Sequence, residues 1–181
     1  MFVASVRLGY SMDIQVFKTA VFPIQAKLLR LAVLMLRNEE EAEDTVQEAL
    51  LKLWLNRHNL KNYRSIEALA VVITKNLCKD KLRSSRWKNS ELSDQADPET
   101  TQPGPHQLAE QRDSRNLMLR LMQNLPDQQK LVVHLRDVEE YSFEEIEKIT
   151  GLGINNIRVT LSRARQNLRQ SFKKVNAYGS A

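Results

Sequence analysis

The segment 142–169 carries the pattern of a helix–turn–helix, and it constrains the fold more than any other part of the sequence. Ser142 is placed to cap a first helix, and Glu145 follows three residues later as the reciprocal member of a capping box. The turn Gly151-Leu152-Gly153 interrupts the helix, because glycine tolerates positive φ. A second helix is predicted from apolar residues at spacings of three and four: Ile154, Ile157, Leu161, Ala164 and Leu168.

The opposite face of this second helix carries side chains suited to DNA, because Arg, Asn and Gln can each make two hydrogen bonds to one base. From Arg158 to the C-terminus there are six basic residues and no acidic one. A solvated amphipathic helix is the alternative, but the capping box, the glycine turn and the acid-free face together favour DNA binding. The expected major-groove contacts are Asn155, Asn156, Arg158, Val159, Ser162, Arg163 and Arg165.

Charge divides the chain into three parts. Residues 1–88 have a net charge of +6, residues 89–106 of −4 and residues 107–181 of +3. The middle part contains three prolines and one large apolar residue, a composition that cannot bury enough surface to fold. We therefore predict an all-α protein of two small helical domains joined by a flexible acidic linker, with the helix–turn–helix in the second. The second domain is expected to contain four helices, the first from Gln107 to about Asn124. The expected boundaries are 12–88, 89–106 and 107–174.

The first domain shows helical periodicity throughout. Two consecutive helices are predicted over 13–21 and 23–37, because Pro23 is tolerated in a first turn but not in a helix interior. Asn38 and Glu41 have the capping-box spacing for the next helix. After a polar loop at 58–65, a further helix is expected from Ile66 to about Arg83, with Ile66, Leu69, Ile73 and Leu77 on its buried side.

Two polar faces in this domain are open to more than one interpretation. Asp44, Gln47 and Glu48 share one side of a helix, which from spacing alone is more often simply solvated. Between Lys75 and Lys88 there are six basic residues and one acid, with Trp87 among them. Cations and aromatic rings together suit single-stranded nucleic acid, although a basic solvated helix end fits this segment equally well.

Several kinds of protein are disfavoured by the sequence. The single cysteine, Cys78, allows no internal disulfide and suits a cytoplasmic protein, and no Cys or His near it suggests a metal site. His134 is expected to be a satisfied surface or interface histidine. No apolar run approaches the roughly 20 residues that span a bilayer. We expect no membrane insertion, no cofactor and no enzymatic activity, since phosphate-loop, HExxH and GxSxG motifs are absent. Met12 begins the first periodic pattern and is a candidate natural start.

The order of these motifs resembles the small extracytoplasmic-function group of bacterial sigma factors. The resemblance extends from Asp13 to Arg169 and rests on two separate blocks around the acidic linker. The matching segments are Ala42–Glu48, Asn76–Arg83, Leu125-Pro126, Ser142 with Glu145-Ile146, and Leu161–Arg165. The chain differs from many relatives in having Leu69 where an early tryptophan is common, and Asn155-Asn156-Ile157 where Gly-Thr-Val is common.

The resemblance implies specific roles for the polar faces. It implies that Asp44, Gln47 and Glu48 bind the clamp of core RNA polymerase, and that the second domain reads the minus-thirty-five element of promoter DNA. The implied minus-ten contacts are Lys61, Asn62, Tyr63, Arg64, Asn76, Lys79, Asp80, Arg83 and Arg86. It also implies an anti-sigma factor as a partner and a monomeric free protein. The alternative from another class is a self-sufficient helix–turn–helix repressor or activator with a helical sensor domain.

Overall fold

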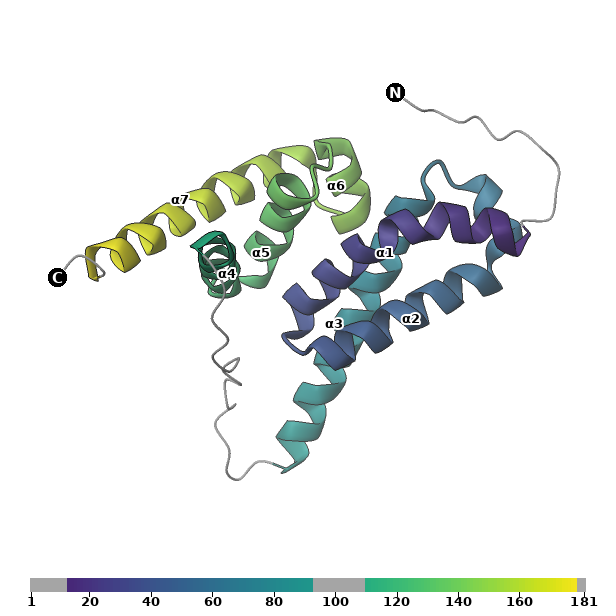
Figure 1. Cartoon of the computed structure of the whole chain (residues 1–181), viewed down its shortest axis with the longest axis horizontal. Helices are drawn as coiled ribbons and strands as arrows, with labels where there is room; N and C mark the ends of the chain where they lie inside the picture. The colour runs from purple at the N-terminus through teal and green to yellow at the C-terminus, as the bar shows by residue number, and fades with distance from the viewer. Residues whose placement is uncertain (1–12, 93–109, 179–181) are drawn as a thin grey trace.

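The computed structural model describes residues 13–92 and 110–178, which we call the first body and the second body (Figure 1). The first body contains α1 (Ile14–Leu36), α2 (Glu39–Leu55), the short 3-10 helix η1 (Arg57–Asn62) and α3 (Ile66–Leu92). The second body contains α4 (Glu110–Gln123), α5 (Asp127–Val133), the π-helical turn η2 (His134–Val138), α6 (Phe143–Thr150) and α7 (Ile154–Tyr178). All the regular elements of these two ranges are helical, which confirms the predicted fold class.

One continuous helix, α1, replaces the two that the sequence predicted. Pro23 lies in the interior of α1, at a position where it cannot donate a hydrogen bond to the preceding turn. Phe17, Val21, Ile24 and Leu28 are buried on both sides of the proline and form one stripe. Because this stripe packs against α2 and α3 as a unit, tertiary packing outweighs the local cost of the proline.

Helix α1 also has the length and apolar composition of a membrane-spanning helix, which the sequence analysis did not identify. It lies within the first body, where α2 and α3 pack along it (Figure 1). Eight of its residues are buried there, so its apolar character is accounted for by the core. The buried residues are Phe17, Val21, Ile24, Leu28, Leu31, Ala32, Leu34 and Leu36.

The buried side of α3 is broader than its sequence pattern indicated. Of the four apolar positions expected inside, Leu77 is buried, whereas Ile66, Leu69 and Ile73 are only half-buried. The reason is that α3 packs on α1 and α2 and also on α6 of the second body. This double packing buries Ala70, Val71, Thr74, Lys75 and Cys78 as well. The Cys78 side chain is fully buried, and burial raises the pKa of its thiol to about 12.

The start of the linker differs from expectation, since α3 continues to Leu92, four residues into the segment predicted to be linker. Helix α4 is described from Glu110, and the expected start at Gln107 falls outside the described residues. The predicted flexibility of the rest of the linker falls outside the described residues. The η1 helix likewise occupies most of the segment predicted as a polar loop, because Leu60 is buried and anchors it.

The second body contains the predicted four helices, with α5 packed against α7 and with α6 against α7. The prediction for His134 was wrong in one respect. Its side chain is buried, and its Nε2 atom lacks a hydrogen bond, with the Oε1 atom of Glu139 3.5 Å away. His134 begins the π-helical turn η2, and burial, with a smaller contribution from the charge of Arg30 in the first body, lowers the pKa of its imidazole.

Candidate nucleic-acid and protein interfaces

The helix–turn–helix has the geometry that its sequence predicted. The Ser142 hydroxyl accepts a hydrogen bond from the Glu145 amide at 3.2 Å, and the Ser142 amide donates to Glu145 Oε2 at 2.8 Å. The turn contains Gly151 with φ of 76°, a conformation that disfavours side chains with a Cβ atom. Its amide donates to the carbonyl of Glu147 at 2.8 Å, which ends α6. These local bonds fix the direction in which α7 begins.

One face of α7 is apolar and buried, and another presents polar groups to solvent. Ile157, Leu161 and Ala164 are buried against the rest of the second body. The exposed residues of its first three turns include six of the seven predicted major-groove contacts: Asn155, Asn156, Arg158, Val159, Ser162 and Arg163. The structure therefore brings these six side chains onto the solvent side of one helix, as a major-groove reader requires.

Arg165, the seventh predicted contact, is bound within the protein. Its Nη2 and Nε atoms donate to the two carboxylate oxygens of Asp137 at 2.6 and 3.0 Å. This pairing raises the pKa of the Arg165 guanidinium, and it connects α7 to η2. Asn167 makes a similar connection to Gln129 of α5 at 2.9 Å. Arg165 thus helps to hold α7 in its orientation against η2.

Sequence reasoning missed Phe143 as a support for an arginine of this face. The guanidinium carbon of Arg158 lies 5.3 Å from the centre of the Phe143 ring, and that of Arg136 lies 4.9 Å from it. A cation over an aromatic face is attracted by the ring quadrupole. Arg136 also donates to the Tyr141 carbonyl at 2.7 Å. The available signal was the position of Phe143 directly after the helix cap, where its ring is free to lie beside the start of α7.

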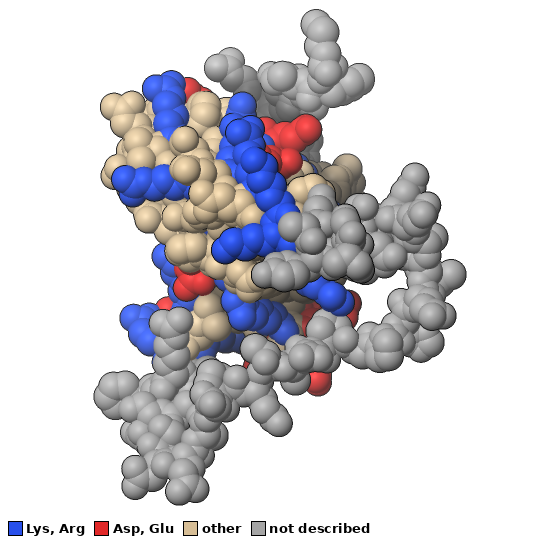
Figure 2. Space-filling view, turned by 90° about the vertical axis from the view of Figure 1, so that its left-hand side faces the viewer, with Lys and Arg blue, Asp and Glu red and all other residues tan. Residues whose placement is uncertain are grey.

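At the end of the molecule where α7 finishes, the charged side chains are mostly basic. Figure 2 views the end at which α7 finishes, and Lys and Arg side chains outnumber Asp and Glu on that face. The exposed basic residues of α7 are Arg158, Arg163, Arg165, Arg169, Lys173 and Lys174. A cluster of like charges of this kind favours the approach of a polyanion.

The first body holds the other predicted DNA contacts in two groups. Asn76, Lys79, Asp80 and Arg83 line one shallow pocket on α3. Arg83 donates to Asp80 at 2.6 Å, so the two side chains shape that pocket together. The side chain of Arg86 lies outside the described residues.

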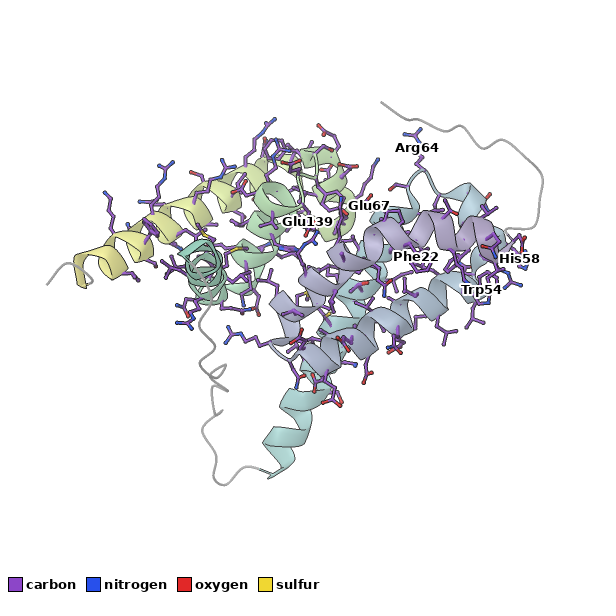
Figure 3. The ribbon with its side chains drawn as sticks, viewed as in Figure 1. Phe22, Trp54, His58, Arg64, Glu67 and Glu139 are labelled. Atoms are coloured by element: carbon purple, nitrogen blue, oxygen red, sulfur yellow. The ribbon has the colours of Figure 1, made fainter. Side chains whose placement is uncertain are left out.

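The second group lies before the start of α3. Asn62, Tyr63 and Arg64 are exposed, and Figure 3 shows Arg64 pointing away from the ribbon. The Tyr63 side chain is 46% exposed, which leaves its ring free to stack on a base. Ten residues of α3 separate its first residue from Asn76, or about 15 Å at the rise of an α-helix. The side chain of Lys61 lies outside the described residues.

Helix α2 presents the predicted polymerase face to solvent. Asp44 and Gln47 are exposed, and Glu48 pairs with Lys52 of the next turn at 3.0 Å. Two apolar residues, Leu51 and Leu55, continue this face at helical spacing and are 55% and 67% exposed. The sequence analysis did not single them out. Exposed leucines beside an exposed polar group are typical of a surface that binds another protein.

Family models match both bodies. Residues 24–88 match the model of sigma-70 region 2, and residues 115–168 match the model of sigma-70, region 4. The two matches lie in the first and second bodies respectively; the first includes the α2 face and both groups of predicted minus-ten contacts, and the second includes the predicted contacts of α7.

Curated relatives and solved structures agree with the family models. The chain is 29% identical over 165 residues to "Probable RNA polymerase sigma factor RfaY" of Xanthomonas campestris, an alignment that covers 87% of this chain and 40% of that protein. It is 26% identical to the RNA polymerase sigma-H factor of Pseudomonas aeruginosa, an alignment that covers 90% of this chain and 89% of that protein. It is 24% identical to the extracytoplasmic-function (ECF) sigma factor SigW of Bacillus subtilis, an alignment that covers 90% of this chain and 92% of that protein.

Among solved structures, the fold matches the sigma factor RpoE from Bartonella quintana, determined in complex with the anti-sigma factor NepR. The TM-score is 0.74 at 23% identity, and the match covers 88% of this chain and 98% of RpoE. CnrH, in complex with the cytosolic domain of CnrY, matches with a TM-score of 0.65 at 16% identity and covers 90% of each chain. With both sigma-70 regions present in order, the chain belongs to the sigma-70 family of RNA polymerase sigma factors, in its extracytoplasmic-function group.

Proposed function

We propose that this protein binds core RNA polymerase through α2 and directs it to promoters by reading two DNA elements with its two bodies. The observation that supports the proposal is the presence of two separate groups of exposed polar side chains on one chain, each suited to a different form of DNA. One is a rigid helix–turn–helix with a polar face on α7, and the other combines the α3 pocket with an exposed tyrosine loop. A protein that only binds duplex operators has no need for the second surface.

The second body is suited to bind the minus-thirty-five element while that element is double-stranded. Side chains on the first turns of α7 enter the major groove, where Arg163 and Arg158 are placed to bond to bases or phosphates. Arg158 is held by the Phe143 ring, which limits the conformations it must lose on binding. Arg165 acts as a positioning residue through its pair with Asp137.

The first body suits the minus-ten element as a separated strand. Tyr63 offers an aromatic face on which an unpaired base stacks, and Asn62 and Arg64 flank it with polar groups. Asn76, Lys79 and Arg83 offer donors to the strand beside that base. Single-stranded DNA is produced only after melting, so this surface acts together with polymerase rather than before it.

On the polymerase side, Asp44, Gln47 and Glu48 form the polar part of the docking face and Leu51 and Leu55 the apolar part. Apolar anchors beside charged groups are the usual composition of a specific protein interface. By the same reasoning the protein acts in the cytoplasm, where polymerase and promoters are, and itself catalyses no reaction. The solved relatives bound to anti-sigma factors support such a factor as a further partner.

The test compares the chain alone with the chain plus core polymerase, using gel shifts and run-off transcription. We expect the free chain to bind promoter duplex only in the non-specific range, roughly 10⁻⁴–10⁻⁶ M at physiological salt. With core enzyme it should support a transcript from one defined start. A self-sufficient regulator behaves in the opposite way, with tight sequence-specific binding alone and no transcript on adding core, and that result would refute the proposal.

A further inference from the structure

One apolar side chain, that of Val159, lies within the polar face of α7 that is proposed to enter the major groove. It is 48% exposed. Among residues 154–169, all of which the structure describes, no other large apolar side chain is exposed. The others are buried or half-buried against the rest of the second body: Ile154, Ile157, Leu161 and Leu168. A single exposed valine is common on protein surfaces, so its significance depends on its neighbours.

The neighbours of Val159 on the helix surface are all polar, and all are predicted DNA contacts. Side chains three and four positions away along a helix lie beside one another. For Val159 these positions are occupied by Asn155, Asn156, Ser162 and Arg163, and each of the four is exposed. Val159 therefore lies at the centre of the face and not at its edge. Any DNA group that faces the centre of this surface must meet a pair of methyl groups.

The stability of α7 does not account for valine at this position. The buried side of the helix is formed by Ile157, Leu161 and Ala164, and Val159 lies away from it. Valine is also a poorer helix former than alanine or arginine, because its branched side chain loses χ1 freedom against the preceding turn. What valine provides is a stiff apolar surface, since one χ1 rotamer dominates in a helix. Little conformational freedom is then lost when that surface contacts a ligand.

Thymine carries the one major-groove group that matches such a surface. Its C5 methyl group is apolar, whereas the remaining major-groove groups of the four bases are hydrogen-bond donors or acceptors. Valine has no side-chain hydrogen bond to offer. An amino group of cytosine or adenine placed against Val159 loses its bond to water without gaining another, which costs free energy.

We propose that Val159 contacts the C5 methyl group of a thymine and thereby makes thymine the preferred base at one position of the duplex element bound by α7. The inference rests on the proposed function, because it takes the second body as the reader of duplex DNA. Val159 and Arg163 are about 6 Å apart along the helix axis, and base pairs are stacked about 3.4 Å apart. The thymine therefore lies within about two base pairs of the base pair nearest Arg163.

A thermodynamic cycle between the side chain and the methyl group tests the proposal. In promoter duplexes bound by the wild-type holoenzyme, each thymine of the upstream element is replaced singly by deoxyuridine, which pairs in the same way and lacks only the methyl group. In competition binding, the wild-type holoenzyme should bind about fourfold more weakly after replacement of one particular thymine, as expected for one methyl group left uncovered. With Val159→Ala the same replacement should have no effect, and with Val159→Ile the loss should persist.

Val175→Ala is the matched control. It removes the same two methyl groups from another exposed position of α7, which is 42% exposed and lies beyond all the predicted contacts. Its holoenzyme should respond to deoxyuridine as the wild type does. Circular dichroism verifies the helical content of each variant. Since Val159 is exposed and alanine is the stronger helix former, loss of the fold is not expected.

Methylated cytosine supplies a second measurement, in which the methyl group is added instead of removed. At the sensitive position, a C·G pair replaces the T·A pair, and the cytosine is then methylated at C5. Methylation should strengthen binding by the wild-type holoenzyme and leave binding by the Val159→Ala holoenzyme unchanged. The absence of any gain in the wild type contradicts direct contact with the methyl group.

Two results of the deoxyuridine series would overturn the proposal. In one, no single replacement weakens binding by the wild-type holoenzyme, so no thymine methyl group is read. In the other, Val159→Ala responds as strongly as the wild type, so another side chain or the shape of the duplex produces the preference.

The proposed function and this inference can fail separately. If the chain with core enzyme gives no promoter-specific transcript, the proposed function fails. The cycle is then measured with the free chain at low salt, where phosphate contacts are stronger, on duplexes that this chain selects from a random pool. Dependence on the methyl group that disappears with Val159→Ala supports the contact in that setting, and its absence refutes the contact.

Discussion

The two bodies fix their nucleic-acid surfaces by different means. In the second body, a capping box, one glycine and an apolar stripe set the register of α7, so local sequence decides which side chains face solvent. In the first body, the candidate residues are divided between a loop anchored by Leu60 and the polar side of α3, which packs on α1 and α2 and also on α6 of the second body. The surface proposed to read duplex DNA thus lies on one helix, whereas the surface proposed to bind a separated strand is assembled from separate elements.

The largest expected effect tests whether the first body, through α2, is the part of the protein that binds polymerase. Gln47→Ala/Glu48→Ala should abolish co-purification with core polymerase, because it truncates the centre of the α2 face without touching the buried stripe of Ala42, Val46 and Ala49. Pull-down with purified core enzyme is the measurement. The control Glu40→Ala/Glu43→Ala, with two exposed acids removed from the same helix, should retain binding. Normal recovery of polymerase by the first variant would show that another face docks.

A smaller effect concerns pH and the second body. The pKa of His134 is lowered from 6.5 to about 4, mainly by burial; Glu139 opposes the shift and Arg30 adds to it. Above pH 6.5 the imidazole is neutral in both the folded and the unfolded state, so the free energy of unfolding has its full value. As pH falls from 6.5, the unfolded chain takes up a proton that the folded chain does not. The free energy of unfolding should therefore decrease by about 2 kcal/mol between pH 6.5 and 5.

Urea unfolding of the wild type and of His134→Leu over this pH range measures the effect, with His134→Asn as a second variant. The leucine variant should show a flatter dependence on pH. Identical slopes for wild type and both variants would mean that His134 does not carry the effect.

The smallest effect distinguishes two arginines of α7. Arg163→Ala should cost roughly 1–3 kcal/mol of specific binding if the side chain pairs with a guanine, with relaxed preference at one position. Arg165→Ala removes the pair with Asp137 and should cost at most about 1 kcal/mol of stability, since the pair is partly exposed, with base preference unchanged. Competition binding of polymerase holoenzyme to promoter variants measures the first, and thermal unfolding the second. A change of base preference in the Arg165 variant would return this residue to the DNA interface.

Much of the second body could be predicted from sequence because its signals are local. Ser142, Glu145 and Gly151 each specify a backbone conformation by themselves, and the structure confirms all three. Arg165 could not be distinguished from Arg163 by sequence, because its partner Asp137 lies 28 residues away along the chain. Phe143 beside Arg158 was missed for the same reason.

In the first body, the failures come from tertiary packing. Pro23 marked a helix boundary by local rules, yet the core stripe of α1 carries the helix through it. Lys75 belonged to a basic polar segment by composition, yet it is buried because α6 packs on α3 and supplies a carbonyl at Ile149. In the second body, His134 was expected to have its hydrogen bonds satisfied, yet its Nε2 atom is buried without one, at the start of a π-helical turn that no sequence rule indicated.

The burial of Cys78 bears on how this protein receives signals. A thiol with a pKa of about 12 is almost entirely protonated inside a cell, whereas the thiolate is the form that attacks peroxides and disulfides. As this is the only cysteine of the chain, the protein carries no cysteine that senses oxidants readily by itself. A transcriptional response to oxidative stress, if this factor mediates one, must begin on another molecule and reach the factor through binding.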